Sequence, residues 1–400
     1  MHTPETRAQT QPSASDVVPA STSRTRSRLC AVLALALVAY FLASVAGFYQ
    51  TDTGFTSFIG FSGGHDYEVP AMAGVPHAHI GGGYDGQFYA QLALVPLLKD
   101  PAIDRALDNP AYRARRIFFS WTAYIAGLGR PAWVLQAYAL QNVVCWLLLA
   151  WLLTRWIPPT TPRRLALWAA CLFGQGLLAS VRLALTDGPS MLLLACAVAT
   201  AERGRSWATS ALLGIGGLAR ETNLFGLTLL PWPRTWKQGL VVTGAVVVAI
   251  LPLLVWQDYL FSIYRTNTFA KQNQLSTPFT AFFFKWETTL RGVWHDGVRS
   301  PHMLALTATA GLTVQAIYAI VSSRRHAASP WWRLAIPYVV LMFLLDFVVW
   351  GGFPGASTRV LLPVTIAFNV LLDAEPDARF WAWYAPGNAV LFYAPDVLRS

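Results

Sequence analysis

The sequence predicts an all-α polytopic membrane protein, with about nine to eleven transmembrane helices and a long first extracytoplasmic loop. Of its 400 residues, 54% are hydrophobic and only 12% are charged, whereas about 25% are charged in a typical soluble domain. The formal net charge of +10 does not indicate a nucleic-acid partner. Most arginines and lysines stand in short connectors between apolar runs, where they serve as topology signals.

The chain is expected to comprise a tail followed by one membrane domain. Residues 1–28 are rich in Ser, Thr, Pro and Gln and end in a basic cluster, which is typical of a disordered cytoplasmic tail. Residues 29–48 then supply a run of about 20 apolar residues, long enough to cross a bilayer. The basic flank keeps the N-terminus in the cytoplasm. Residues 29–400 are therefore predicted to form a single membrane domain.

Two polar segments between the apolar runs are predicted to be extracytoplasmic loops. The first covers residues 49–116 and carries the candidate catalytic motif, and the second covers residues 257–301. One run is interrupted by Arg220-Glu221-Thr222-Asn223, which predicts two short helical pieces that meet there. The apolar runs after the first loop are 117–129, 132–153, 165–182, 188–201, 207–232, 238–256, 302–321, 331–350, 358–373 and a weaker run at 380–394.

The stretch Gly81–Leu92 places one carboxylate, Asp85, between glycines and aromatic side chains. Glycines allow a sharp turn and a close approach to a ligand. Tyr84, Phe88 and Leu92 are spaced four apart, which predicts a short helix that starts at Asp85 and ends near Pro96. Asp85 is therefore either a chemical centre or an N-cap that accepts hydrogen bonds from the first amides of the helix.

A charged side chain at the centre of a transmembrane helix costs about 2.5–3.5 kcal/mol on insertion scales, so such residues need a partner or a role. Asp187 stands at a predicted helix start, where it caps the helix or binds a ligand. Arg220 and Glu221 either pair with each other at the helix break or contribute to a site. Arg359 either holds a phosphate or snorkels to the surface.

Other functional classes have weaker support. His77 and His79, together with Asp66, Glu68 or Asp85, offer ligands to a divalent metal, but their spacing is not diagnostic, so we expect no metal and no other cofactor. The sequence has no G-x-S-x-G element, which argues against a serine hydrolase. It also has no phosphate-binding P-loop, which argues against an ATP-driven pump.

Four short motifs resemble those of bacterial membrane proteins of the glycosyltransferase C superfamily. They are Tyr84-Asp85-Gly86-Gln87-Phe88-Tyr89, Asp187-Gly188-Pro189, Arg203-Gly204-Arg205 and Leu218-Ala219-Arg220-Glu221-Thr222-Asn223. The resemblance covers about residues 29–370 and points to the polyprenyl-phosphate-sugar-dependent type, or to proteins of cell-surface glycopolymer formation. In that superfamily an acidic residue of the first external loop acts on the acceptor, and the donor is a polyprenyl-phosphate sugar. The resemblance implies the same role for Asp85.

The predicted function is therefore transfer of a sugar to a cell-envelope glycan or lipid, at the outer face of the bacterial inner membrane. Asp85 is the predicted catalytic residue, and the expected partners are the lipid-linked donor, the acceptor and membrane lipids, without nucleic acid. Two alternatives stay open, a transporter or flippase of lipid-linked sugars and a non-catalytic protein of glycopolymer assembly. The predicted substrate-binding residues are Asp52, Tyr84, Gln87, Phe88, Tyr89, Asp187, Arg220, Glu221 and Arg359.

Overall fold

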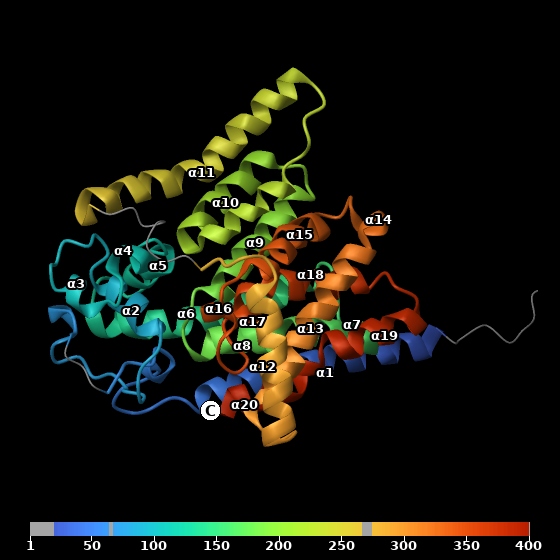
Figure 1. Ribbon diagram of the computed structural model, residues 1–400, viewed down its shortest axis with the longest axis horizontal. Helices are drawn as coiled ribbons and strands as arrows, with labels where there is room; N and C mark the ends of the chain where they lie inside the picture. The colour runs from blue at the N-terminus through green and yellow to red at the C-terminus, as the bar shows by residue number, and fades with distance from the viewer. Residues whose placement is uncertain (1–19, 64–66, 266–273, 400) are drawn as a thin grey trace, which may run out of the picture.

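The protein is described by a computed structural model that covers residues 20–63, 67–265 and 274–399 (Figure 1). These residues form helices and connecting loops with no named β-strand, which confirms the all-α class. The α-helices are α1 (Ala20–Ala46), α2 (Gly86–Leu94), α3 (Ile103–Ala106), α4 (Pro110–Ala114), α5 (Phe118–Ala126), α6 (Pro131–Leu153), α7 (Pro162–Phe173), α8 (Gln175–Arg182), α9 (Asp187–Ala201), α10 (Ser206–Ala219), α11 (Trp236–Tyr264), α12 (Thr280–Asp296), α13 (Pro301–Val321), α14 (Ser323–His326), α15 (Pro330–Leu344), α16 (Phe347–Trp350), α17 (Ser357–Val360), α18 (Leu362–Leu372), α19 (Asp377–Gly387) and α20 (Ala394–Arg399). The 3₁₀ helices are η1 (Thr56–Phe58), η2 (Pro70–Met72), η3 (Glu221–Leu229) and η4 (Ala389–Tyr393).

Four of the described helices are long and apolar enough to cross a membrane: α1 from Thr25 onward, α6, α11 and α13. The pair α7 and α8, bent by 42°, gives a fifth candidate if it counts as one span. Several other apolar helices, including α9, α10, α15 and α18, have only 10–17 residues. At 1.5 Å per residue they reach about 15–26 Å, less than the roughly 30 Å of a hydrocarbon core. The long helices are compatible with a multi-pass membrane protein.

Helix α11 carries an exposed apolar surface of the kind that contacts lipid in membrane proteins. It runs along an outer edge of the molecule, against α10 (Figure 1). Large apolar side chains on it, among them Leu251, Leu254 and Val255, are more than half exposed. An apolar surface of this kind is covered in soluble proteins by a partner, and in a bilayer it contacts lipid.

The helix boundaries follow local sequence signals. Proline occupies an early position in α4, α6, α7, α13 and α15, where its missing N–H removes no helical hydrogen bond. Thr161 caps α7 by accepting a hydrogen bond from the N–H of Arg164. Helix α10 ends at Ala219 and η3 begins at Glu221, which confirms the predicted break in the 207–232 run. Helix α9 begins at Asp187, also as predicted.

The segment predicted as the first loop is largely structured. It contains η1, η2, α2, α3 and α4, and α2 packs against α5 and α6. The predicted short helix after Asp85 is confirmed as α2. Helix α1 begins at Ala20, inside the stretch predicted to be a tail. Residues 1–19 of that tail lie outside the described residues, as does the metal-ligand candidate Asp66.

Gly86, the first residue of α2, sits where the backbone of two other segments approaches closely. A Cβ at this position would lie 2.5 Å from the carbonyl oxygen of Leu183 and 2.7 Å from that of Ile59. We expect Gly86→Ala to destabilise the fold by about 1–3 kcal/mol, because neither backbone can rotate away as a side chain can. The matched control is Gly239→Ala in α11, where a Cβ meets nothing within 4 Å and helix propensity favours alanine by roughly 0.4–1 kcal/mol.

Chemical denaturation of the two purified variants in mixed micelles measures both effects against the wild-type chain. Equal stability of the Gly86→Ala and Gly239→Ala variants would contradict the close packing of α2 against these backbones.

Candidate functional site

A polar cavity of about 70 Å³ lies where α2, α4, the start of α9, the α10–η3 break and α17 come together. Two carboxylates, Asp85 and Asp187, and three guanidiniums, Arg116, Arg220 and Arg359, line it. The chain thus gathers charges from five separate parts of the sequence around one cavity, although few of its residues are charged. The other lining residues are Tyr89, Tyr112, Leu185, Thr186, Gln274, Val349, Ala356 and Val360.

Asp85 occupies the N-cap position of α2, but its side chain makes no capping hydrogen bond. Its Oδ1 instead accepts a hydrogen bond from Arg113 Nη2 at 2.8 Å. The side chain is 40% exposed, whereas that of Asp187 is 7% exposed. Asp85 therefore marks the open side of the cavity, and Asp187 marks its inner end. The interpretation of Asp85 as a side-chain cap is wrong.

Arg113 is fixed in place by more than Asp85. Asp108 accepts hydrogen bonds from its Nε at 2.8 Å and its Nη2 at 2.7 Å, and the guanidinium lies 4.7 Å from the ring centroid of Phe88. Burial alone would lower the pKa of Arg113, but the hydrogen bond to Asp108 and the charge of Asp85 raise it above its ordinary value. Arg113 is therefore a permanent cation that orients the Asp85 carboxylate.

Glu221 forms a second ion-pair cluster with two consecutive loop arginines. Its Oε1 lies 2.6 Å from Arg115 Nη2, and its Oε2 lies 3.0 Å from Arg116 Nε. Arg116 also donates a hydrogen bond from Nη1 to the hydroxyl of Tyr89 at 3.3 Å. Burial alone would lower the pKa of Arg116, but the charge of Glu221 raises it well above its ordinary value.

Asp187 forms the inner end of the cavity between two other arginines. Its Oδ1 pairs with Arg220 Nη1, and its Oδ2 lies 3.6 Å from Arg359 Nη1. Arg359 also donates a hydrogen bond from Nη2 to the hydroxyl of Tyr84 at 3.0 Å. Arg359 is only 9% exposed, so its interpretation as a snorkelling surface residue is wrong.

The pairing of Arg220 with Asp187 also overturns the suggestion that Arg220 and Glu221 pair with each other. Arg220 has extended backbone dihedrals, φ −162° and ψ 126°. Successive side chains of an extended segment point to opposite sides. Glu221 accordingly joins Arg115 and Arg116, while Arg220 joins Asp187.

Within the described part of the chain, the ion pairs around this cavity join five arginines to four carboxylates. Removing charges from water is costly unless they are paired. Here the arginines outnumber the carboxylates by one, which leaves one positive charge in excess. Guanidinium groups bind phosphate and carboxylate oxygens through parallel hydrogen bonds. The cavity is therefore suited to an anionic ligand. The paired residues are Arg113, Arg115, Arg116, Arg220, Arg359, Asp85, Asp108, Asp187 and Glu221.

The structure brings most of the predicted site residues together. Asp85, Tyr89, Asp187, Arg220 and Arg359 line the cavity. Three further predicted residues contact the cavity indirectly: Tyr84 bonds to Arg359 and Glu221 pairs with Arg116, both of which line it, and Phe88 packs against Arg113, which holds Asp85.

Two predicted substrate-binding residues lie apart from the cavity lining. Asp52 is exposed in the loop that precedes η1 and is not brought to the cavity. Gln87 accepts a hydrogen bond from the backbone N–H of Ser62 at 3.0 Å, so it ties the loop to α2.

Several residues of the site were not among the predictions, chiefly Tyr112, Arg113, Arg115, Arg116 and Gln274. One signal was available in the sequence. Three arginines within four positions end a segment predicted to be extracytoplasmic, where topology does not call for positive charge. The structure explains the cluster: these arginines pair with the carboxylates of Asp85, Asp108 and Glu221. No comparable signal marks Gln274.

Comparisons with protein-family models, curated protein sequences and solved structures found no match to this chain. Its function is therefore inferred from the cavity, its ion pairs and the short motifs of the sequence.

Proposed function

We propose that this chain is an inner-membrane glycosyltransferase, which moves a hexosyl or pentosyl group from a polyprenyl-phosphate carrier to a cell-envelope glycan or lipid. The observation that carries this proposal is the cavity in which Asp85 and Asp187 lie beside Arg116, Arg220 and Arg359. Transfer from a lipid phosphate requires cations at the departing phosphate and a carboxylate near the acceptor hydroxyl. One cavity offers both.

In the proposed reaction, the acceptor hydroxyl enters at the open side and attacks the anomeric carbon of the sugar. Asp85 accepts the hydroxyl proton or orients the hydroxyl. The bond between the anomeric carbon and the phosphate oxygen breaks, and its electron pair leaves with the polyprenyl phosphate. Arg220 and Arg359 stabilise the negative charge that develops on that phosphate. Each guanidinium has five N–H donors, so pairing with Asp187 leaves donors for the ligand.

The proposed membrane arrangement places the N-terminus in the cytoplasm and residues 49–116 and 257–301 outside. Short helices then contribute interrupted crossings. Helix α10 and η3 illustrate this: 14 residues at 1.5 Å and 9 residues at 2.0 Å give about 39 Å together. A break in a membrane helix is tolerated where it lines a polar cavity, and Arg220 lines the cavity at this break.

A reconstituted transfer assay tests the proposed function. The purified chain is placed in lipid vesicles with radiolabelled polyprenyl-phosphate sugars and an envelope glycan or lipid fraction as acceptor. We expect label to move from the carrier to the acceptor, and free polyprenyl phosphate to accumulate in equal amount. In cells, deletion of the gene is expected to remove one sugar from the envelope glycan.

Two outcomes would overturn the transferase assignment. Label that crosses the bilayer but stays on the carrier identifies a flippase. Label that neither crosses nor transfers, in a chain whose deletion still alters the envelope glycan, identifies an assembly protein.

A further inference from the structure

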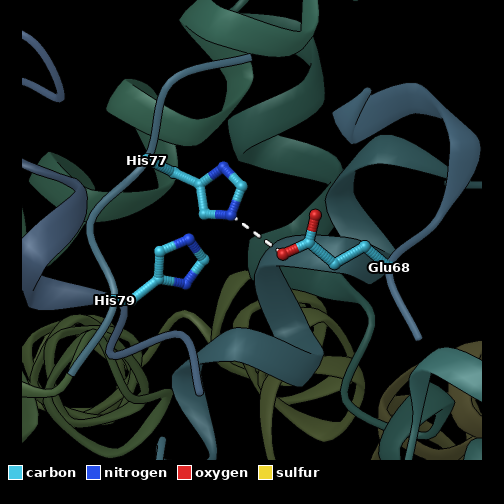
Figure 2. A group of neighbouring side chains, drawn as sticks. All are labelled: Glu68, His77 and His79. Atoms are coloured by element: carbon cyan, nitrogen blue, oxygen red, sulfur yellow. Dashed lines mark hydrogen bonds and ion pairs between the residues drawn. The ribbon is translucent and has the colours of Figure 1, made fainter. Parts of the chain in front are cut away.

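Three potential metal ligands meet in the loop that precedes α2: Glu68, His77 and His79 (Figure 2). One ligand atom from each residue lies within 4.8 Å of the other two. His77 Nε2 and Glu68 Oε1 are 2.9 Å apart, and the two imidazole ring centroids are 4.6 Å apart. None of the three residues lines the cavity of Asp85, so the cluster calls for an explanation of its own.

The hydrogen bonds of the imidazoles orient the cluster as a metal site would require. His77 Nδ1 lies 2.8 Å from the carbonyl oxygen of Val75, and His79 Nδ1 lies 3.2 Å from that of Ser62. A carbonyl oxygen only accepts hydrogen bonds, so each Nδ1 carries a proton. The other ring nitrogen of His77, Nε2, faces Glu68 Oε1 at 2.9 Å. Donation from the second ring nitrogen to a backbone carbonyl is typical of metal-bound histidines.

The two atoms that face each other in this contact are both of a kind that binds metal ions. His77 Nε2 and Glu68 Oε1 lie 2.9 Å apart, and the side chain of His77 is only 9% exposed. An imidazole nitrogen and a carboxylate oxygen at this distance either share a proton or bind a common cation. Metal analysis distinguishes these two arrangements.

We propose that Glu68, His77 and His79 bind one Zn²⁺ ion, with a water molecule as the fourth ligand. Two imidazoles and one carboxylate form a ligand set that zinc accepts, whereas calcium and magnesium prefer oxygen ligands alone. Zinc–ligand distances of about 2.0–2.1 Å place tetrahedral ligand atoms about 3.4 Å apart. The ligand atoms lie within 4.8 Å of one another, and binding would bring them to about 3.4 Å: His77 Nε2 and Glu68 Oε1 would move apart from 2.9 Å, and the exposed His79 would adjust to them.

The bound zinc would fasten the loop to the helix that begins beside Asp85. Glu68 directly precedes Val69, whose N–H donates a hydrogen bond to Gln91 Oε1 of α2 at 3.1 Å. On the other arm, the N–H of Ala78, between the two histidines, donates a hydrogen bond to Thr56 Oγ1 at 2.9 Å. One ion would thus join the segment tied to α2 with the segment tied to η1.

Metal analysis of the full-length chain in detergent micelles tests the site. The protein is stripped with a chelator, dialysed against micromolar ZnCl₂ and analysed for zinc and protein content. We expect about one zinc per chain and a lower Tm after the chelator. We expect His79→Ala, and Glu68→Gln as the conservative variant, to weaken zinc binding at least 10–100-fold, because each removes a ligand.

The matched control is His295→Ala, which removes an exposed histidine of α12 and should retain full binding. The zinc site is overturned if the wild-type chain retains no zinc, or if His79→Ala and Glu68→Gln retain as much as the control. Since these readouts are metal content and Tm, they remain informative whether or not the transfer assay succeeds.

Discussion

An Asp85→Asn substitution is expected to lower the rate of sugar transfer by about 10²–10⁴-fold, the usual contribution of a general base. The amide keeps the size of the side chain but cannot accept the acceptor proton. Because the Asp85 side chain makes no capping hydrogen bond, the substitution removes no cap from α2. The transfer assay with lipid-linked sugar measures the rate, and thermal unfolding in micelles verifies that the fold is retained.

The matched control is Asp108→Asn. Asp108 shares the partner Arg113 with Asp85 and has a similarly exposed side chain, 42% against 40%, but it does not line the cavity. Asp108→Asn should therefore disturb Arg113 while transfer falls far less than in Asp85→Asn. If the two variants transfer sugar at the same rate, Asp85 acts only by holding Arg113, and its role as a base is refuted.

The second large effect is expected from Asp187→Asn. The substitution leaves Arg220 and Arg359 facing each other in a buried setting without their shared carboxylate. Breaking a buried ion pair by removing one partner costs about 3–5 kcal/mol. We therefore expect a large loss of stability in chemical denaturation, together with loss of transfer.

Two further variants test whether the loss of stability in Asp187→Asn comes from the buried charges and not from replacing any aspartate by asparagine. Asp377→Asn breaks the pair with Arg163 at the surface, where Asp377 is 89% exposed, and should cost at most about 1 kcal/mol. Adding Arg220→Met to Asp187→Asn removes one of the stranded cations and should restore part of the lost stability. Similar destabilisation by Asp187→Asn and Asp377→Asn would contradict the buried charge cluster.

Features that depend on nearby residues could be predicted from the sequence. The start of α2 after Asp85, the start of α9 at Asp187 and the break at Arg220 all follow from glycine, proline and charged residues within a few positions. The all-α class follows from composition and long apolar runs. Four of the five charged residues that line the cavity, all but Arg116, were also identified, because a charge in or beside an apolar run and a carboxylate within a glycine-rich aromatic stretch are local signals.

Features that depend on tertiary contacts could not be predicted. Arg220 and Glu221 are neighbours of opposite charge. Only the extended backbone at Arg220 shows that they pair with different partners, Arg220 with Asp187 and Glu221 with Arg116. Hydropathy also overstated the lengths of individual helices, because runs such as 207–232 divide at polar or glycine-containing breaks. Arg113 was missed because its role appears only when α4 packs beside α2.

The hydrogen bond between Arg359 and Tyr84 joins positions 275 residues apart. A ribosome adding 5–20 residues per second needs roughly 14–55 s to synthesise the intervening chain. Asp187 and Arg220 are synthesised within that interval and are present before Arg359, the second cation that pairs with Asp187. The charge cluster is thus completed late in biogenesis, and a chain that stops before position 359 lacks one of the cations of Asp187.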